Sequence, residues 1–167
     1  YSIPAYDAGK TPARDLGDTI KSQKLLVLEG CVLVSKLNPS TPRIWLPRER
    51  AGSRQVASTE FLVCTGEGGN GYSKELIYSL ASSAPMLEYL TGLASGTSNS
   101  HQRVRPDDFL AYRWAEPPKP VRNLFNACIG PVLSKLACLL QESQTLVAMR
   151  DALLPRLVTG DLRVAGT

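Results

Sequence analysis

The stretch from Pro131 to Thr159 most constrains what this chain can fold into, because it reads as one long amphipathic helix. At about 1.5 Å per residue such a helix is roughly 40 Å long, more than one compact domain of this size needs to cover itself. Its apolar residues recur in alternating steps of three and four, which is typical of helices that pack along their whole length. They form two adjacent seams, one of Val132, Leu136, Leu139, Leu146, Leu153 and Leu157, the other of Leu133, Leu136, Leu140, Val147, Leu154 and Leu157.

Two adjacent seams predict two helical neighbours for this helix. Ser143 and Arg150 interrupt the shared line, and polar residues at such positions often fix register and partner number at some cost in stability. The alternative is one wide amphipathic helix that lies on the core of its own chain.

Length and composition set the remaining bounds. The 167 residues leave room for one ordinary domain and an appended element, and an apolar content of 43% is ample for a core. A net charge of +4 and a pI near 9.0 are compatible with a polyanionic partner without identifying one. We find no signal peptide and no apolar run of membrane-spanning length, so we expect a cytoplasmic protein without membrane contact. Because the chain opens on Tyr1 and not on Met, we expect a fragment or a processed chain.

The four cysteines are predicted to be buried free thiols. Cys31, Cys64, Cys128 and Cys138 show no CxxC spacing and no histidine cluster around them, and each stands among apolar residues. This pattern favours reduced thiols over disulfides or a zinc site.

The residues ahead of the long helix predict an α+β domain with a small twisted β-sheet and short helices. Continuous apolar runs predict buried strands over 25–28 and 31–34, separated by a turn at Glu29-Gly30, and a further strand over 55–64. Short helices are predicted over 73–81 and 85–93, with Ser73 and Ser83 as caps. Polar and proline-rich composition predicts loops over 1–24 and 35–47.

Prolines mark the boundary between the two parts of the chain. Pro117, Pro118 and Pro120 predict a first domain over 1–117 and a helical region over 118–167. Within that region a short helix over 121–129 is expected to precede the long helix of about 131–158. Gly130-Pro131 favours a kink or a fresh start there, because proline lacks the backbone N–H that would continue the first helix.

The sequence contains few residues that could support catalysis. His101 is its one histidine, so a metal site or a catalytic triad built on histidine is not expected. Residues 38–41, Asn-Pro-Ser-Thr, partly match the Asn-Pro-Pro-aromatic motif of amino-methylating enzymes. They lack its second proline and its aromatic residue, and no glycine-rich cofactor fingerprint follows a strand upstream. We therefore predict a protein that is not an enzyme and has no cofactor and no metal.

Two polar loops are better suited to binding. Hydroxyl, amide and cationic side chains with exposed backbone N–H groups suit phosphate oxygens, and asparagine and arginine can also read base edges. The alternative for each loop taken alone is a solvated surface, and His101 fits a local hydrogen bond as well as a phosphate contact. The candidates are Lys36, Asn38 and Arg43 in one loop and Thr97, Ser98, Asn99, Ser100, His101, Gln102 and Arg103 in the other.

Five stretches resemble one target-recognition domain, with its conserved helix, of the specificity subunit of type I restriction–modification systems. The last of them, MRDALLPRLVTGDLRV, is the most specific, and together they span nearly the whole chain. The stretches are Ile20–Lys24, Glu29–Arg43, Ala57–Val63, Thr91–Val104 and Met149–Val164.

The resemblance implies a non-catalytic protein that recognises one half of a bipartite double-stranded DNA site. In that family two long helices pair antiparallel and set the spacing between the half-sites. The methyltransferase (modification) subunits dock beside them, and the restriction subunit joins through the complex. On this chain, the helix would pair with a second copy or with the second half of a longer specificity subunit. Arg150 would meet the partner or stay within its own helix, and the expected interface is Leu136, Leu140, Val147, Arg150, Leu154 and Leu157.

Two other interpretations remain open. One is a recognition domain cut from an enzyme that fuses methylation and restriction in one chain, and an upstream cofactor-binding fold would favour it. The other is a helical protein-binding adaptor without DNA affinity. The base-reading residues cannot be transferred from the resemblance, because recognition loops differ between members that read different sequences.

Overall fold

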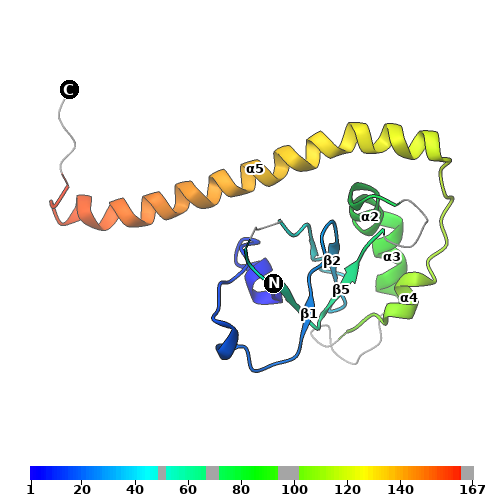
Figure 1. Ribbon diagram of the computed structural model, residues 1–167, viewed down its shortest axis with the longest axis horizontal. Helices are drawn as coiled ribbons and strands as arrows, with labels where there is room; N and C mark the ends of the chain where they lie inside the picture. Colours follow the sequence, from blue (N-terminus) through cyan, green and yellow to red (C-terminus); the bar gives the residue numbers. More distant parts are fainter. Residues whose placement is uncertain (49–51, 67–71, 94–101, 163–167) are drawn as a thin grey trace. The chain divides into compact units, whose positions relative to one another are not determined.

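The computed structural model describes residues 1–48, 52–66, 72–93 and 102–162, and it has the expected α+β composition (Figure 1). The chain divides into two compact units, Tyr1–Arg122 and Asn123–Thr167. The first unit contains the described strands and four α-helices, and the second contains most of one long helix. The helices are α1 (Ile3–Asp7), α2 (Lys74–Ala81), α3 (Ala84–Leu93), α4 (Pro106–Leu110) and α5 (Lys119–Val158), and the strands are β1 (Lys24–Leu26), β2 (Val32–Ser35), β3 (Ile44–Trp45), β4 (Val56–Ser58) and β5 (Phe61–Cys64).

The described strands form two antiparallel sheets in place of the one expected. β1 pairs with β4, and β2 lies between β3 and β5. The two apolar runs on either side of Glu29-Gly30 therefore form strands but do not pair with each other. The predicted strand over 55–64 is two strands, because a turn at Thr59-Glu60 separates β4 from β5.

β2 is the centre of the core and is buried on both faces, as its continuous apolar sequence predicted. Because side chains alternate along a strand, Leu33 packs with Trp45 and Phe61 on one face. Val32 and Val34 pack on the other face with residues of α2. The partly buried residues of the N-terminal segment against the first face include Tyr1 and Ile3, Ala5 and Tyr6 of α1.

α1 and α4 were not expected from the sequence, and local chemistry explains both. The hydroxyl of Ser2 caps α1 by accepting from the Ala5 N–H, and Pro4 stands in its first turn. Pro106 opens α4 in the same way, and the Asp108 carboxylate accepts from the Arg105 N–H. The predicted helices over 73–81 and 85–93 are confirmed as α2 and α3, and Ser73 caps α2 as expected.

α5 is one continuous helix over Lys119–Val158, so the predicted fresh start near residue 131 is wrong. Pro131 leaves only the Ala127 carbonyl without its helical donor. The division between the two compact units falls after Arg122, so the first turn of α5 belongs to the first unit. There Arg122 forms an ion pair with Glu116 and lies 5.3 Å from the centre of the Tyr72 ring.

Candidate nucleic-acid interface

Two polar segments from distant parts of the sequence run side by side after β2. Leu37 and Arg103 form an isolated antiparallel bridge. This bridge joins part of the two loops that were predicted separately to contact DNA. The flanking backbone hydrogen bonds run from the Asn38 N–H to the Gln102 carbonyl (2.8 Å) and from the Val104 N–H to the Lys36 carbonyl (2.9 Å).

A buried neighbour turns the Arg103 side chain towards solvent. Val104 is 4% exposed and packs with Met86 and Leu90 of α3. Successive side chains of an extended segment point in opposite directions, and the Arg103 side chain is 57% exposed. The hydrophobic cluster of Met86, Leu90 and Val104 thus anchors the segment that carries Arg103.

The turn between β4 and β5 completes the arrangement. The Lys36 N–H donates to the Glu60 carbonyl at 2.8 Å, so the turn is tied to the first polar segment. The Glu60 carboxylate accepts two hydrogen bonds from the Arg103 guanidinium, at 2.9 Å from Nη2 and 3.1 Å from Nε. These bonds to the Glu60 carboxylate raise the pKa of Arg103 further above its usual value.

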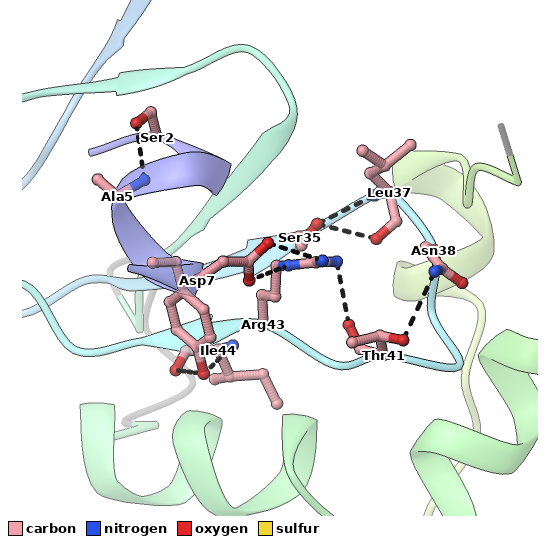
Figure 2. Close-up of polar contacts among 10 residues, drawn as sticks. Ser2, Ala5, Asp7, Ser35, Leu37, Asn38, Thr41, Arg43 and Ile44 are labelled. Atoms are coloured by element: carbon pink, nitrogen blue, oxygen red, sulfur yellow. Dashed lines mark hydrogen bonds and ion pairs between the residues drawn. The ribbon is translucent and has the colours of Figure 1, made fainter. Parts of the chain in front are cut away.

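Asn38 is held by its own loop (Figure 2). Its backbone has a positive φ of 50°, a conformation that asparagine tolerates better than most residues. The Ser40 hydroxyl donates to Asn38 Oδ1 at 2.7 Å, and the Thr41 N–H donates to the Asn38 carbonyl at 2.9 Å. A bidentate contact of Asn38 with adenine would therefore compete with Ser40 for the amide oxygen.

Arg43 is paired with another residue of the fold, whereas the sequence predicted that it contacts DNA. Its Nε and Nη2 donate to the two Asp7 carboxylate oxygens at 2.7 and 2.9 Å, and its Nη1 donates to the Thr41 carbonyl (Figure 2). The side chain is only 13% exposed. The hydrogen bonds from Arg43 lower the pKa of Asp7, and the same bonds raise the pKa of Arg43. This pair ties α1 to the start of β3 and leaves Arg43 poorly placed to reach a base.

Replacing Asp7 by asparagine is expected to lower the free energy of unfolding at pH 7 by about 1 kcal/mol, a modest loss because Asp7 is half exposed to screening solvent. Since the folded-state pKa of Asp7 is lowered, the carboxylate stabilises the fold above its unfolded pKa, and this stabilisation disappears as pH falls through the folded pKa. Urea unfolding at pH 7 and near pH 2.5 should therefore show a difference between wild type and Asp7→Asn that shrinks in acid. Asp18→Asn is the matched control, and an equal loss in that variant would contradict the assignment.

Five of the predicted contact residues, Thr97, Ser98, Asn99, Ser100 and His101, lie outside the described residues. The structure brings Lys36 and Asn38 together with Gln102 and Arg103, and it places Arg43 with Asp7 instead. Within the described ranges, nothing pairs with the Lys36 ammonium group, and Arg105 is exposed two residues beyond Arg103. Arg103 and Arg105 flank the buried Val104 and are both exposed, and cations spaced in this way suit the charges of a phosphate backbone.

A second candidate surface lies on α5. No residue of Lys119–Val158 is buried, although a large part of the helix is apolar. The five apolar residues of the predicted interface are among its exposed side chains, from Leu140 at 37% to Leu154 at 54%. A shallow depression around Ser143 lies at the predicted interruption of the seams, lined by Leu139, Glu142, Ser143, Leu146, Val147 and Arg150.

Arg150 is engaged within its own helix. Its Nε and Nη2 both donate to Asp151 Oδ1, at 2.8 and 2.7 Å, and both side chains are more than half exposed. Of the two roles considered for Arg150, the structure shows the contact within the helix. An exposed pair of this kind contributes little to stability.

By length and composition α5 is also long and apolar enough to span a membrane. The prediction that the sequence has no such apolar run is therefore wrong. The same test is passed by core helices of soluble proteins, so it is weak evidence for a membrane.

The cysteines are only partly as predicted. Cys31 is buried and Cys64 is half-buried, but Cys128 and Cys138 on α5 are exposed, and all four are free thiols. Burial raises the pKa of Cys64 to about 12, so its reactive thiolate is scarce near neutral pH. Among the residues that the structure describes, no group of three His, Cys, Asp or Glu side chains could hold a metal ion.

Sequence reasoning missed two acidic residues of these contacts. Asp7 and Glu60 are each paired bidentately with a predicted DNA-contacting arginine, across 36 and 43 residues of sequence. Nothing in the local sequence around either carboxylate signals such a distant partner. No family model, no curated protein and no solved structure matches the chain.

Proposed function

We propose that this chain is a non-catalytic DNA-recognition component of a type I restriction–modification system, and that it reads one half of a bipartite double-stranded site. The five stretches that resemble a specificity subunit motivate the family. The observation that carries the DNA-binding part is the bridge between Leu37 and Arg103, which unites two loops predicted separately to bind DNA.

The joined segments have the chemistry that a DNA backbone requires. Lys36 and Arg103 supply cations from adjacent extended segments, and the hydroxyl and amide residues of the second loop precede Arg103 directly in the sequence. Phosphate contacts of this kind fix the register of a protein on the duplex, while base-edge contacts give sequence preference. In this proposal the joined segments position the domain on its half-site.

α5 supplies the assembly surface in the same proposal. Burying an exposed apolar face of this length is favourable by roughly 25 cal/mol per Å² removed from water. A second long helix, from another copy or from the second half of a longer subunit, would cover it in antiparallel fashion. The methyltransferase subunit would dock beside the helix pair and bring the restriction subunit with it.

A helical protein-binding adaptor without DNA affinity is the second candidate. The exposed apolar face of α5 favours it on its own. The two functions differ in what they require of the first unit, because an adaptor has no use for cations on the joined segments. Removing those cations therefore separates the two functions.

Replacing both Lys36 and Arg103 by glutamine is expected to weaken binding to a double-stranded oligonucleotide. Each phosphate contact contributes about 0.9 to the slope of log K against log salt. Loss of the Lys36 contact should flatten the slope by about 0.9, and loss of Arg103 should add as much again on a duplex that displaces Glu60. Affinity at low salt should fall by up to about tenfold. Fluorescence anisotropy with a labelled duplex measures both quantities.

The control variant is Arg14→Gln with Lys21→Gln, which removes the same charge from exposed positions elsewhere in the first unit. We expect this control to change the slope little. Equal losses in both double variants would mean that net charge alone drives binding, and unchanged binding in the Lys36 and Arg103 variant would favour the adaptor.

A further inference from the structure

The anion bound to Arg103 is part of the chain itself. The Glu60 carboxylate accepts from Nε and Nη2 of Arg103 through its two oxygens. This fork-to-fork geometry is also the one in which arginine binds a phosphate. Glu60 therefore engages the same edge of the Arg103 guanidinium that a bidentate DNA phosphate would use.

The backbone of Glu60 is held at both its N–H and its carbonyl. Its N–H donates to the Ser58 hydroxyl at 3.3 Å, and its carbonyl accepts from the Lys36 N–H at 2.8 Å. The carboxylate thus stands on a short turn tied to the segment that also bears Lys36. These backbone contacts place the Glu60 side chain next to Arg103.

The pair remains open to exchange. The side chains of Arg103 and Glu60 are 57% and 31% exposed, so solvent and a ligand can reach both. Exposed pairs between arginine and carboxylate are weak, and a phosphate on a polyanion can displace the carboxylate when its neighbours are also contacted. A single phosphate without such neighbours gains little from the exchange.

We propose that Glu60 is a specificity-determining residue: an intramolecular phosphate mimic that occupies Arg103 and suppresses binding to DNA that makes few other contacts. This inference rests on the proposed function. A non-specific duplex can contact Arg103 only by displacing Glu60, and the ion pair between Glu60 and Arg103 is then lost. A duplex that also contacts the rest of the interface offsets this loss. Glu60 therefore increases the difference in affinity between such a duplex and a non-specific one.

The test is a double-mutant cycle on Glu60 and Arg103. Glu60→Gln should tighten binding to a duplex of random sequence about three- to tenfold and steepen the salt slope by about 1, because one more cation is free to release counterions. In an Arg103→Gln background the same substitution should have almost no effect. Glu60→Asp keeps the charge and should remain close to wild type.

Glu88→Gln provides the matched control, since Glu88 is an exposed carboxylate on α3. It makes the same change in net charge, so a gain equal to that of Glu60→Gln would overturn the proposal in favour of a general electrostatic effect. A Glu60→Gln gain that persists without Arg103 would overturn it for the same reason. Melting temperatures of all variants show whether a change in affinity reflects a change in folding.

The failure of this inference differs from the failure of the proposed function. If wild type binds DNA and Arg103→Gln weakens binding while Glu60→Gln leaves it unchanged or weaker, Glu60 is only a structural partner and the inference is wrong. If neither wild type nor Glu60→Gln binds any duplex at low salt, both the function and the inference are wrong.

Discussion

Introducing aspartate at both Leu140 and Leu154 is expected to abolish assembly through α5. Both side chains are exposed apolar members of the same predicted seam. Full burial of one leucine is worth about 1.5–3 kcal/mol, and a buried unpaired carboxylate adds a further cost. The association should weaken by at least about 4 kcal/mol, or roughly a thousandfold. Sedimentation of the chain, alone and mixed with the proposed methyltransferase partner, measures the change.

The matched control puts aspartate at Ser134 and Ala148, which are exposed and lie on the opposite side of the helix from the seams. We expect this variant to assemble as wild type does. Far-ultraviolet circular dichroism should show equal helix content in both variants. Retained assembly in the Leu140 and Leu154 variant would contradict the assignment of this seam.

Truncating Phe61 to alanine is expected to lower the free energy of unfolding by about 3–5 kcal/mol. Phe61 is fully buried at the start of β5, opposite Ser35 in the register with β2. Its ring centre lies 6.4 Å from that of Trp45 in an edge-on arrangement. Loss of the ring leaves a cavity beside the central strand that its neighbours cannot fill without moving. Domains are stable by only about 5–15 kcal/mol, so this change removes a large share.

Urea unfolding followed by tryptophan fluorescence gives this value directly, because Trp45 reports on the same core face. Leu110→Ala is the control, since Leu110 is 78% exposed and its truncation should cost under about 0.5 kcal/mol. Similar losses in the two variants would mean that Phe61 is not at the centre of the fold.

Elements with a strong local signal could be predicted from the sequence. The continuous run over 31–34 predicted a buried strand, and β2 (Val32–Ser35) is buried along its whole length. Ser73 ahead of an amphipathic run predicted the start of α2. In both cases neighbouring residues decide the structure, through hydrophobic burial and helix capping.

Elements decided by distant partners were missed. β3 has two residues within a proline-rich stretch, and it is a strand because Ile44 and Trp45 pair with β2. Gly30 predicted a turn between two strands, but β1 pairs with β4 from more than 25 residues away in the sequence. A turn residue permits a change of direction without selecting the strand that lies alongside.

The candidate site also combines features that local sequence predicts with features that depend on distant residues. The residue types predicted two polar binding loops, and the structure joins the ends of those loops at Leu37 and Arg103. The sequence did not reveal that Arg43 is committed to Asp7 or that Arg103 is held by Glu60. Whether an arginine is free depends on carboxylates 36 and 43 positions away, which no local pattern encodes.

The most direct test of DNA recognition is the binding of the wild-type chain to a double-stranded oligonucleotide across a salt series, followed by anisotropy. We expect measurable affinity at 50 mM salt and a fall of at least about threefold by 200 mM, as the phosphate contact of Lys36 alone implies. Binding that is absent at 50 mM salt, or that does not change with salt, would contradict the account.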